Sequence, residues 1–348
     1  MQPACSVSPA AATIRRWLAT LILAGGAVTC FSTAAEERGR MPAASAERSP
    51  LQWIEAIQRA AVRVNYSGTI VYQAGGEMRT SRITHMFDGA HSHERVQTLD
   101  GKPREYIRLR TESNDEVRCL IPESRRVIVE HRAIEDPFPG LIGAPAEAVL
   151  ERYDLKTGEL ERVAGVKCQV LTLEPRDTLR YGYRLCVDRS TGLLLRAQTV
   201  GEQREVLEQV AFTDIKIGEK IDRSRLKPEW PTEGWTVERS EYTRADVDRA
   251  GWVIPTPEGF RRTKEVLRRL GTADAMQVVF SDGLTTISVF IEPLAAAATK
   301  APVDDVQIMG PTAAYSRKLG DALVTVIGEV PPLAVRTVAK SVEFRRPK

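Results

Sequence analysis

The chain has 348 residues, of which 43% are hydrophobic and 27% are charged, and its formal net charge is +3. Acidic and basic residues are mixed along the whole length, so the charge balance gives no reason to expect a nucleic-acid partner. The length favours two domains over one.

The N-terminal segment 1–35 has the features of a cleaved secretory signal peptide. Arg15 and Arg16 supply a positive start, and an uncharged apolar run from Trp17 to Phe31 is followed by small residues. This run is too short for an ordinary membrane span, although an uncleaved anchor is the alternative. We therefore expect an exported protein whose residues 36–48 form a mobile N-terminus.

Residues 49–217 are predicted to form the first domain, which begins with a helix. Ser49 is a good N-cap residue, and Pro50 suits the first helical position. Apolar residues then recur at helical spacing, at Leu51, Ile54, Ile57, Ala61 and Val64. This spacing predicts a helix that packs on an apolar surface.

From Tyr66 the hydrophobic period changes to two, and turn residues arrive regularly, which predicts an antiparallel meander. The predicted strands are 67–74, 77–87, 91–98, 103–112, 116–121, 126–132, 165–174, 180–187, 193–200 and 204–217. A short helix is expected at 145–153. So many strands tend to curl, and we expect the first helix to lie across the concave face. The predicted fold class is mainly β (α+β), with an unclosed antiparallel barrel and a packed helix.

Residues 218–243 have the composition of a linker, with several prolines and few periodic apolar positions. Residues 244–348 are predicted to form a smaller α+β domain. Its expected elements are strands at 276–281, 285–292, 312–317 and 322–327 and a C-terminal helix at 333–342. Segment 260–270 suits a helix and a strand about equally, so its structure is left open.

The sequence contains none of the familiar catalytic motifs for serine, metal-dependent or nucleotide-dependent enzymes. His91 and His93 would share one face of a strand, with His85 as a third candidate, but zinc needs three or four ligands. A solvated strand face is the preferred interpretation of these histidines. We therefore predict a binding protein and no enzyme, with no metal and no cofactor.

Cys168 and Cys186 flank a predicted hairpin turn. If the hairpin is centred on Asp177, the two cysteines face each other and can form a disulfide. A slip of one residue would spoil this register. Cys119 is a competing partner, and three reduced cysteines are a further alternative.

Several stretches, spread in order over most of residues 50–343, resemble the MucB/RseB family of periplasmic negative regulators of the envelope-stress sigma factor. No single stretch is decisive, but the ordered set is fairly specific. The stretches are 65–72, Arg-Tyr-Gly-Tyr-Arg-Leu at 180–185, 188–194, Pro-Glu-Gly-Phe at 257–260, Ser-Asp-Gly-Leu at 281–284, 287–290 and 328–331. Cys186 stands where some relatives are expected to have Trp, so the resemblance does not itself support the disulfide.

The resemblance implies a lipoprotein-carrier-like half-barrel followed by a smaller, partner-binding domain. It implies that the protein binds the periplasmic segment of a transmembrane anti-sigma factor and protects that segment from regulated proteolysis. It further implies a periplasmic location and release by a lipid or lipopolysaccharide-like amphiphile. A homodimer is left open.

Two sets of candidate binding residues follow. An apolar concave face is a reasonable acyl-chain site, with the candidates Ile70, Tyr72, Phe87, Leu171, Leu173, Tyr183 and Leu185. Aromatic and Arg residues anchor many protein interfaces, which favours the candidates Trp235, Trp252, Phe260, Arg261 and Arg262. For either set, ordinary core packing is the competing interpretation.

Two other functions remain as alternatives. A periplasmic lipid or lipoprotein carrier would use the same half-barrel, although a simple carrier needs no second domain. An envelope hydrolase would need a cleft with a perturbed carboxylate or histidine, and the sequence offers no motif for one.

Overall fold

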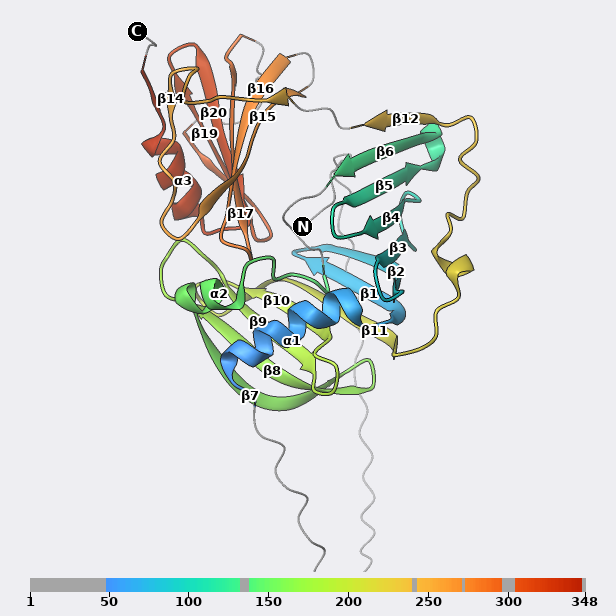
Figure 1. The fold of residues 1–348 in the computed structure, drawn as a ribbon. Coiled ribbons are helices and arrows are strands. Elements are labelled where there is room, and N and C mark those ends of the chain that lie inside the picture. Colours follow the sequence, from blue (N-terminus) through green and yellow to red (C-terminus); the bar gives the residue numbers. More distant parts are fainter. Residues whose placement is uncertain (1–47, 132–137, 240–242, 271–272, 296–303, 346–348) are drawn as a thin grey trace, which may run out of the picture. The chain divides into compact units, whose positions relative to one another are not determined.

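The computed structural model describes residues 48–131, 138–239, 243–270, 273–295 and 304–345. Within these residues the chain forms three α-helices, two short 3-10 helices and three β-sheets (Figure 1). The predicted fold class, mainly β with an unclosed sheet and a smaller C-terminal part, is confirmed. No helix of the described part is long and apolar enough to cross a membrane.

The first sheet has twelve strands in the order β12-β6-β5-β4-β3-β2-β1-β11-β10-β9-β8-β7. Its neighbours are antiparallel except that β12 pairs with β6 in parallel. The strands are β1 (Tyr66–Ala74), β2 (Glu77–Phe87), β3 (Ser92–Thr98), β4 (Glu105–Arg110), β5 (Asp115–Ile121), β6 (Arg126–His131), β7 (Tyr153–Val163), β8 (Val166–Pro175), β9 (Gly182–Asp188), β10 (Leu194–Val200), β11 (Val206–Ile217) and β12 (Thr236–Arg239). The sheet is unclosed because β7 and β12 form its two edges.

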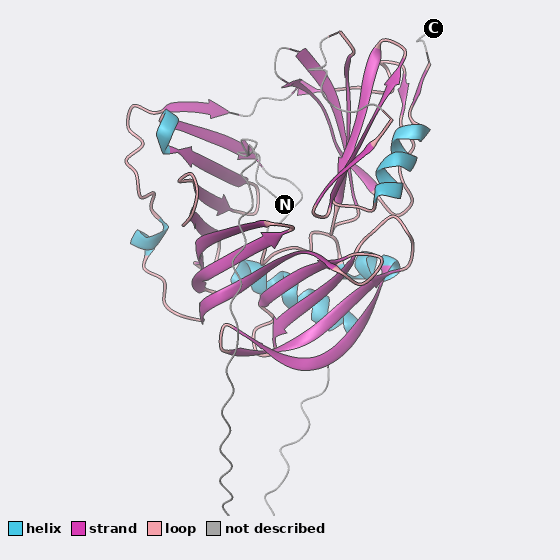
Figure 2. Cartoon of the chain, turned by 180° about the vertical axis from the view of Figure 1, so that it is seen from behind, coloured by secondary structure: helices cyan, strands magenta, loops and turns pink. Residues whose placement is uncertain are grey.

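Helix α1 (Pro50–Arg63) lies across the inner face of this curved sheet (Figures 1 and 2). It begins as predicted, because the Ser49 hydroxyl accepts a hydrogen bond from the Gln52 backbone N–H at 3.3 Å and the Gln52 side chain accepts one from the Ser49 N–H at 2.8 Å. This reciprocal pair satisfies two donors that the first helical turn leaves open. A second helix, α2 (Ala146–Arg152), packs beside α1.

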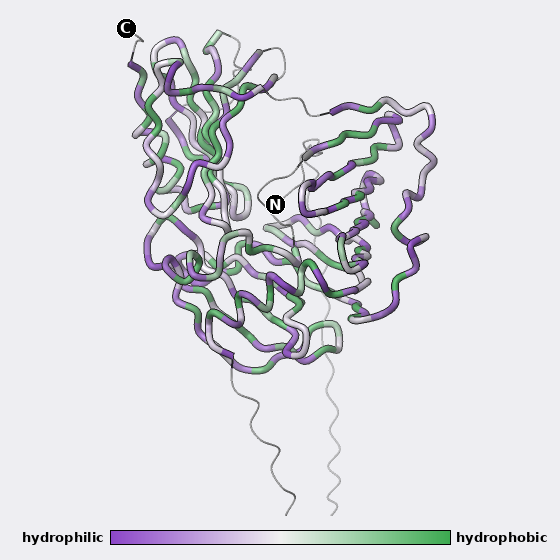
Figure 3. Tube along the Cα trace, in the orientation of Figure 1, coloured by the Kyte–Doolittle hydropathy of each residue, from purple (hydrophilic) through white to green (hydrophobic). Residues whose placement is uncertain are grey.

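The second sheet has seven strands in the order β13-β15-β16-β17-β20-β19-β18, with α3 (Pro332–Ser341) packed against β19 and β20. A two-stranded sheet joins β14 (Trp252–Val253) to β21 (Glu343–Phe344). The seven strands are β13 (Thr243–Arg244), β15 (Arg261–Leu270), β16 (Ala273–Ser281), β17 (Thr286–Pro293), β18 (Val306–Met309), β19 (Thr312–Leu319) and β20 (Ala322–Gly328). Alternate apolar residues of β16, β17, β19 and β20 build most of the core between this sheet and α3, and Figure 3 shows the hydrophobic residues of this region.

Some elements differ from the sequence predictions. Strand β7 was not predicted, because it is an edge strand with mostly exposed residues and an irregularity around Gly158. Segment 261–270 is a strand. The segment predicted as a linker contains the short helix η2 (Arg223–Leu226) and β12, whose side chains are all exposed. Such short or polar elements carry little hydrophobic periodicity, which is the main signal that a sequence offers.

Candidate functional site

The predicted acyl-chain residues lie on one face of the twelve-stranded sheet. Leu171 pairs with Leu185, Leu185 with Ala197, Ala197 with Val210 and Val210 with Tyr72, so side chains from five strands form one continuous row. Because side chains of directly paired residues share a face, this row points to the side on which α1 lies. Leu173 and Tyr183 pair with each other and share this face by alternation with Leu171 and Leu185.

The face is filled in this structure. Leu171, Leu173 and Leu185 are fully buried, and Tyr183 is 5% exposed. They form one core with apolar residues from α1, α2 and the segment between β6 and α2, namely Trp53, Ile54, Ile57, Ile142, Ala144, Ala146 and Val149. The same burial raises the pKa of Tyr183 well above its ordinary value. An acyl chain could bind to this face only if α1 or the segment 138–145 moved away from it.

The other three predicted lining residues are Ile70 and Tyr72 on β1 and Phe87 on β2. Ile70 packs at the edge of a second core cluster. The Tyr72 hydroxyl donates a hydrogen bond to a Glu208 carboxylate oxygen at 2.8 Å, and burial together with Glu208 raises the pKa of Tyr72. Phe87 is half-buried, with the Arg63 guanidinium 6.0 Å from its ring centre.

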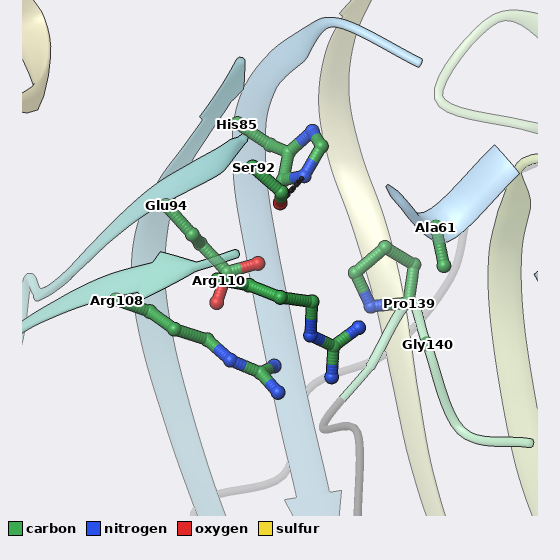
Figure 4. A pocket seen from close by; sticks show the side chains of 8 residues that line it. All are labelled: Ala61, His85, Ser92, Glu94, Arg108, Arg110, Pro139 and Gly140. Carbon is green, nitrogen blue, oxygen red and sulfur yellow. Dashed lines mark hydrogen bonds between the residues drawn. The ribbon is translucent and has the colours of Figure 1, made fainter. Parts of the chain in front are cut away.

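A small polar pocket lies at the C-terminal end of α1 (Figure 4). Its lining residues are Ala61, His85, Ser92, Glu94, Arg108, Arg110, Pro139 and Gly140. His85 is 1% exposed and bonds to the Val64 carbonyl at 2.8 Å and to the Ser92 hydroxyl at 2.7 Å. Burial lowers the pKa of His85 to about 4, so this imidazole is neutral at pH 7. With both ring nitrogens occupied, His85 has a structural role in the described part of the chain.

The histidines considered as metal ligands are divided between two places. His85 points into the pocket, whereas Asp88, His91 and His93 bring ligand atoms within 4.8 Å of one another at an exposed turn. The Asp88 carboxylate is already occupied, because it accepts bonds from the His91 and Ala90 N–H groups, from His93 and from Arg223. These bonds, with the His91 N–H first, lower the pKa of Asp88.

The predicted disulfide between Cys168 and Cys186 is present, with 5.4 Å between the two Cα atoms. The predicted register is wrong, however. Cys168 pairs with Asp188, and Val170 pairs with Cys186, so the two cysteines are diagonal neighbours. The hairpin is displaced by an even number of positions, which keeps both cysteines on one face of β8 and β9 and still allows the bond. Cys119, on β5, is the partner of neither.

Sequence reasoning missed a buried arrangement that connects the two large sheets. The Arg180 side chain is fully buried just before β9, and its Nε donates to Asp282 Oδ2 at 2.6 Å from the turn between β16 and β17. Its Nη2 donates to the Glu258 carbonyl at 2.9 Å, its Nη1 pairs with Asp177, and its guanidinium lies 4.5 Å from the Phe260 ring centre. We call Arg180, Asp177, Asp282, Glu258 and Phe260 the Arg180 joint.

Neighbouring glycines allow this close approach. A Cβ atom on Gly259 would lie 2.5 Å from Arg180 Nη2, and one on Gly283 would lie 2.0 Å from the Ala144 Cβ, and both glycines have positive φ angles. Neither position accepts another residue without rearrangement. The residues of the joint fall in or next to the stretches 180–185, 257–260 and 281–284, which were recognised by their resemblance to the family. Nothing in the sequence indicates that these three stretches are in contact.

The predicted partner-binding residues do not form one surface. Trp252 and Phe260 are buried in the core of the second sheet, at 6% and 7% exposure. Trp235 is half-buried against β5 and β6 of the first sheet. Arg262 is half-buried and donates to the Ile254 carbonyl at 3.2 Å, whereas Arg261 is exposed.

Comparison with known proteins gives a consistent result. Residues 49–230 match the family model of the MucB/RseB N-terminal domain, and residues 246–343 match that of the MucB/RseB C-terminal domain. The sigma factor AlgU regulatory protein MucB of Pseudomonas aeruginosa is 30% identical over 298 residues, which are 83% of this chain and 89% of the relative. The sigma-E factor regulatory protein RseB of Haemophilus influenzae is 25% identical over 313 residues, which are 87% of this chain and 94% of the relative.

Comparison with solved structures leads to the same family. The crystal structure of MucB in complex with MucA(peri) is similar with a TM-score of 0.65 and 29% identity, and covers 84% of this chain and 98% of that one. The complex of Pseudomonas aeruginosa MucA and MucB gives a TM-score of 0.68 and 28% identity, and covers 85% and 99%. Because both parts are matched in order and one relative is 30% identical over most of both chains, the chain belongs to the MucB/RseB family.

Proposed function

We propose that this chain is a periplasmic regulator of a sigma-E-type envelope-stress factor, acting by binding and without catalysis. The supporting observation is the ordered match of residues 49–230 and 246–343 to the two domains of one regulatory family. The relatives are regulatory proteins of AlgU and of sigma-E by name. The apolar run near the N-terminus suits export, and the mature protein would start near residue 36.

The proposed partner is the periplasmic segment of a transmembrane anti-sigma factor. The support is that MucB, with a similar fold, has been solved in complex with MucA(peri). Binding would protect the segment from regulated proteolysis because a bound segment is inaccessible to a protease. For this chain we place the contact on the C-terminal part, 244–348, with Arg261 as the candidate whose side chain is exposed.

The proposed signal is a lipid or lipopolysaccharide-like amphiphile whose acyl chain enters the inner face of the first sheet. Each buried methylene would contribute about 0.8 kcal/mol. Such a ligand shifts the protein toward release only if it binds the releasing conformation better than the other. Because the apolar row is covered by α1, that second conformation must differ in the position of the helix or of the segment 138–145.

The apolar inner face also supports the alternative of a lipid or lipoprotein carrier. One experiment separates the two. Residues 36–348 are titrated with the purified periplasmic segment of the anti-sigma factor from the same source, with and without lipopolysaccharide. Tight binding that lipopolysaccharide weakens is expected. Binding that lipopolysaccharide does not change would remove the sensing role, and lipopolysaccharide binding without segment binding would favour the carrier. Light scattering on the same samples shows whether the chain is a homodimer.

A further inference from the structure

One short segment of the first sheet's domain contacts both α1 and the second sheet. On one side, Gln58 Nε2 of α1 donates to the carbonyl of Ala144 at 2.5 Å and more weakly to that of Ile142 at 3.4 Å. On the other side, the Gly143 N–H donates to the Gly283 carbonyl at 2.7 Å. Residues 140–145, which we call the bridging loop, therefore join the helix to the turn that carries Asp282.

The bridging loop and the turn are packed closely, backbone against backbone. The Ala144 backbone nitrogen lies 2.6 Å from where a Cβ atom of Gly283 would stand, so the two backbones are in direct contact. The turn itself is rigid, because Asp282 Oδ1 accepts bonds from the N–H groups of Leu284 and Thr285, each at 2.9 Å. A displacement of Ala144 must therefore displace the turn or break the Gly143 hydrogen bond.

In the same region, each of the two parts contributes one leucine to the hydrophobic core of the other. Leu284 of the turn packs against the core that contains Leu171 and Leu185, on the first sheet. Leu179, next to Arg180, packs against the core of the second sheet. Separation of the turn from the bridging loop would expose both leucines to water, in addition to breaking polar contacts.

The Arg180 joint makes this connection all-or-none. Arg180 and Asp282 are 0% and 1% exposed, and the guanidinium uses three nitrogens on three different acceptors. Partial separation would leave two buried charges without partners, which is strongly unfavourable, so the joint is either closed or fully hydrated.

We propose that the bridging loop couples the position of α1 to the Arg180 joint. A ligand that lifts α1 from the inner face pulls the Gln58–Ala144 contact, disturbs the turn at 281–285 and opens the joint, which frees the second sheet from the first. The coupling stands on the contacts above. Its use to release the anti-sigma segment rests on the proposed function.

The coupling is tested by hydrogen exchange in residues 36–348 without any ligand. Gln58→Ala removes the hydrogen bonds between α1 and the bridging loop and should speed exchange of the Gly143, Leu284 and Thr285 amides about fivefold, the effect of one lost hydrogen bond. Arg59→Ala, an exposed neighbour on α1, is the matched control and should leave these amides unchanged. Unchanged exchange at Leu284 and Thr285 in Gln58→Ala would overturn the coupling.

A second variant checks that these amides report on the joint. Arg180→Lys keeps the charge but loses the fork of donors, and it does not alter the Asp282 Oδ1 acceptor of the Leu284 and Thr285 amides, so it should speed their exchange at least tenfold more than Gln58→Ala. Asp282→Asn is the second joint variant, and because Asp282 Oδ1 accepts directly from those two amides, its effect is measured at the Gly143 amide. Asp154→Asn, which breaks an exposed pair with Arg176 in the same region of the chain, is the control. Protection that stays intact in both joint variants would contradict the role of Arg180.

The regulatory use is tested with lipopolysaccharide as the probe. Wild-type chain with lipopolysaccharide should show faster exchange at Leu284 and Thr285, and Asp282→Asn should bind the anti-sigma segment at least tenfold more weakly without lipopolysaccharide. If the segment binds neither protein, the proposed function fails while the exchange result for Gln58→Ala still decides the coupling. If lipopolysaccharide weakens segment binding but leaves these amides protected, the regulatory use of the joint is wrong.

Discussion

The two halves of the twelve-stranded sheet are held by different chemistry. Across β7 to β11 and β1, an apolar inner face packs against α1, α2 and the bridging loop, and the largest buried side chains are leucines and tyrosines. Across β2 to β6 the apolar cluster is small, with Leu120, Val127 and Val129 as its buried members. Here arginines and acids supply many of the contacts between strands.

The second half also binds the segment that leads to the second sheet. Glu105 is fully buried, pairs with Arg95 and accepts a bond from the Glu229 N–H at 3.0 Å. Arg95 in turn donates to the Arg225 carbonyl at 3.2 Å, while Trp230 and Trp235 cover the small apolar cluster. Charged contacts therefore fix segment 222–235 against β3 to β6.

The difference indicates which half can change shape. Apolar packing is non-directional, so under the proposed function an acyl chain would take over apolar contacts that α1 makes with the inner face. Buried, hydrogen-bonded ion pairs tolerate no partial displacement. We infer that a ligand would reorganise the half that contains α1, while the half that holds segment 222–235 stays fixed.

The largest effect should come from the apolar half. Leu185→Ala removes a fully buried side chain from the core beneath α1 and should lower the free energy of unfolding by about 4 kcal/mol. Leu120→Ala, on β5 and 1% exposed, is the matched change in the charged half and should cost about 2 kcal/mol, because its apolar cluster is smaller. Urea denaturation of both variants measures the difference. Equal losses would mean that the two halves do not differ in this way.

The charged half should depend on one buried acid. Glu105→Gln leaves Arg95 with only the exposed Glu229 carboxylate, 3.6 Å away, as a counter-charge and puts an amide donor near the Glu229 N–H, so a loss of about 3 kcal/mol is expected. Tryptophan fluorescence should also shift, because Trp230 and Trp235 lie on the segment that Glu105 holds. Glu123→Gln, which breaks an exposed pair with Arg104, is the control and should have little effect. A fluorescence spectrum that does not change would contradict the fixing role of Glu105.

The contrast between the halves also explains which elements of the fold could be predicted from the sequence. Helix α1 and most long strands follow from caps, turn residues and apolar periodicity, which are strong where one face is buried. Strands β7 and β12 carry no such pattern because they lie at the edges, where charged residues are favoured and core contacts are few. Cys168 and Cys186 lie on one face as predicted, but the predicted register was wrong, because alternation fixes a face and not the pairing along the strand.

Less of the candidate site than of the fold could be predicted from the sequence. The sequence predicted that α1 lies across the apolar face, but nothing in it showed that the bridging loop packs into the same core. The Arg180 joint unites residues that are 78 and 102 positions apart in the chain. Such long-range polar contacts have no local signature, so recognisable stretches can mark the residues without showing their arrangement.

A pH series sharpens the comparison at the boundary between the halves. His85 on β2 bonds to Val64 after α1 and to Ser92 on β3, and its pKa of about 4 lies below the ordinary value of 6.5. Between these values the unfolded chain binds more protons than the folded one, so stability falls as the pH falls. This histidine should account for a loss of about 2 kcal/mol between pH 7 and pH 5.

His85→Gln keeps hydrogen-bonding groups at this position but does not titrate. The urea midpoint of the variant should therefore change less between pH 7 and pH 5 than that of the wild type, and the difference isolates His85 from acids such as Asp88, whose lowered pKa has effects at lower pH. Parallel pH curves for the two proteins would show that His85 is not held neutral.

The smallest expected effect tests how loosely α1 is held. Ser49→Ala removes the side chain that accepts the Gln52 N–H at the start of α1 and should cost about 1 kcal/mol. Because this end of the helix is exposed, the loss should appear as faster amide exchange in the first turn of α1, with exchange in β3 to β6 unchanged. Ser341→Ala, at the C-terminal end of α3, where its hydroxyl donates to the Val338 carbonyl, is the control. If Ser49→Ala instead increased exchange across β3 to β6 as much as in α1, the two halves would open as one unit, and the charged half could not serve as the fixed support from which α1 moves.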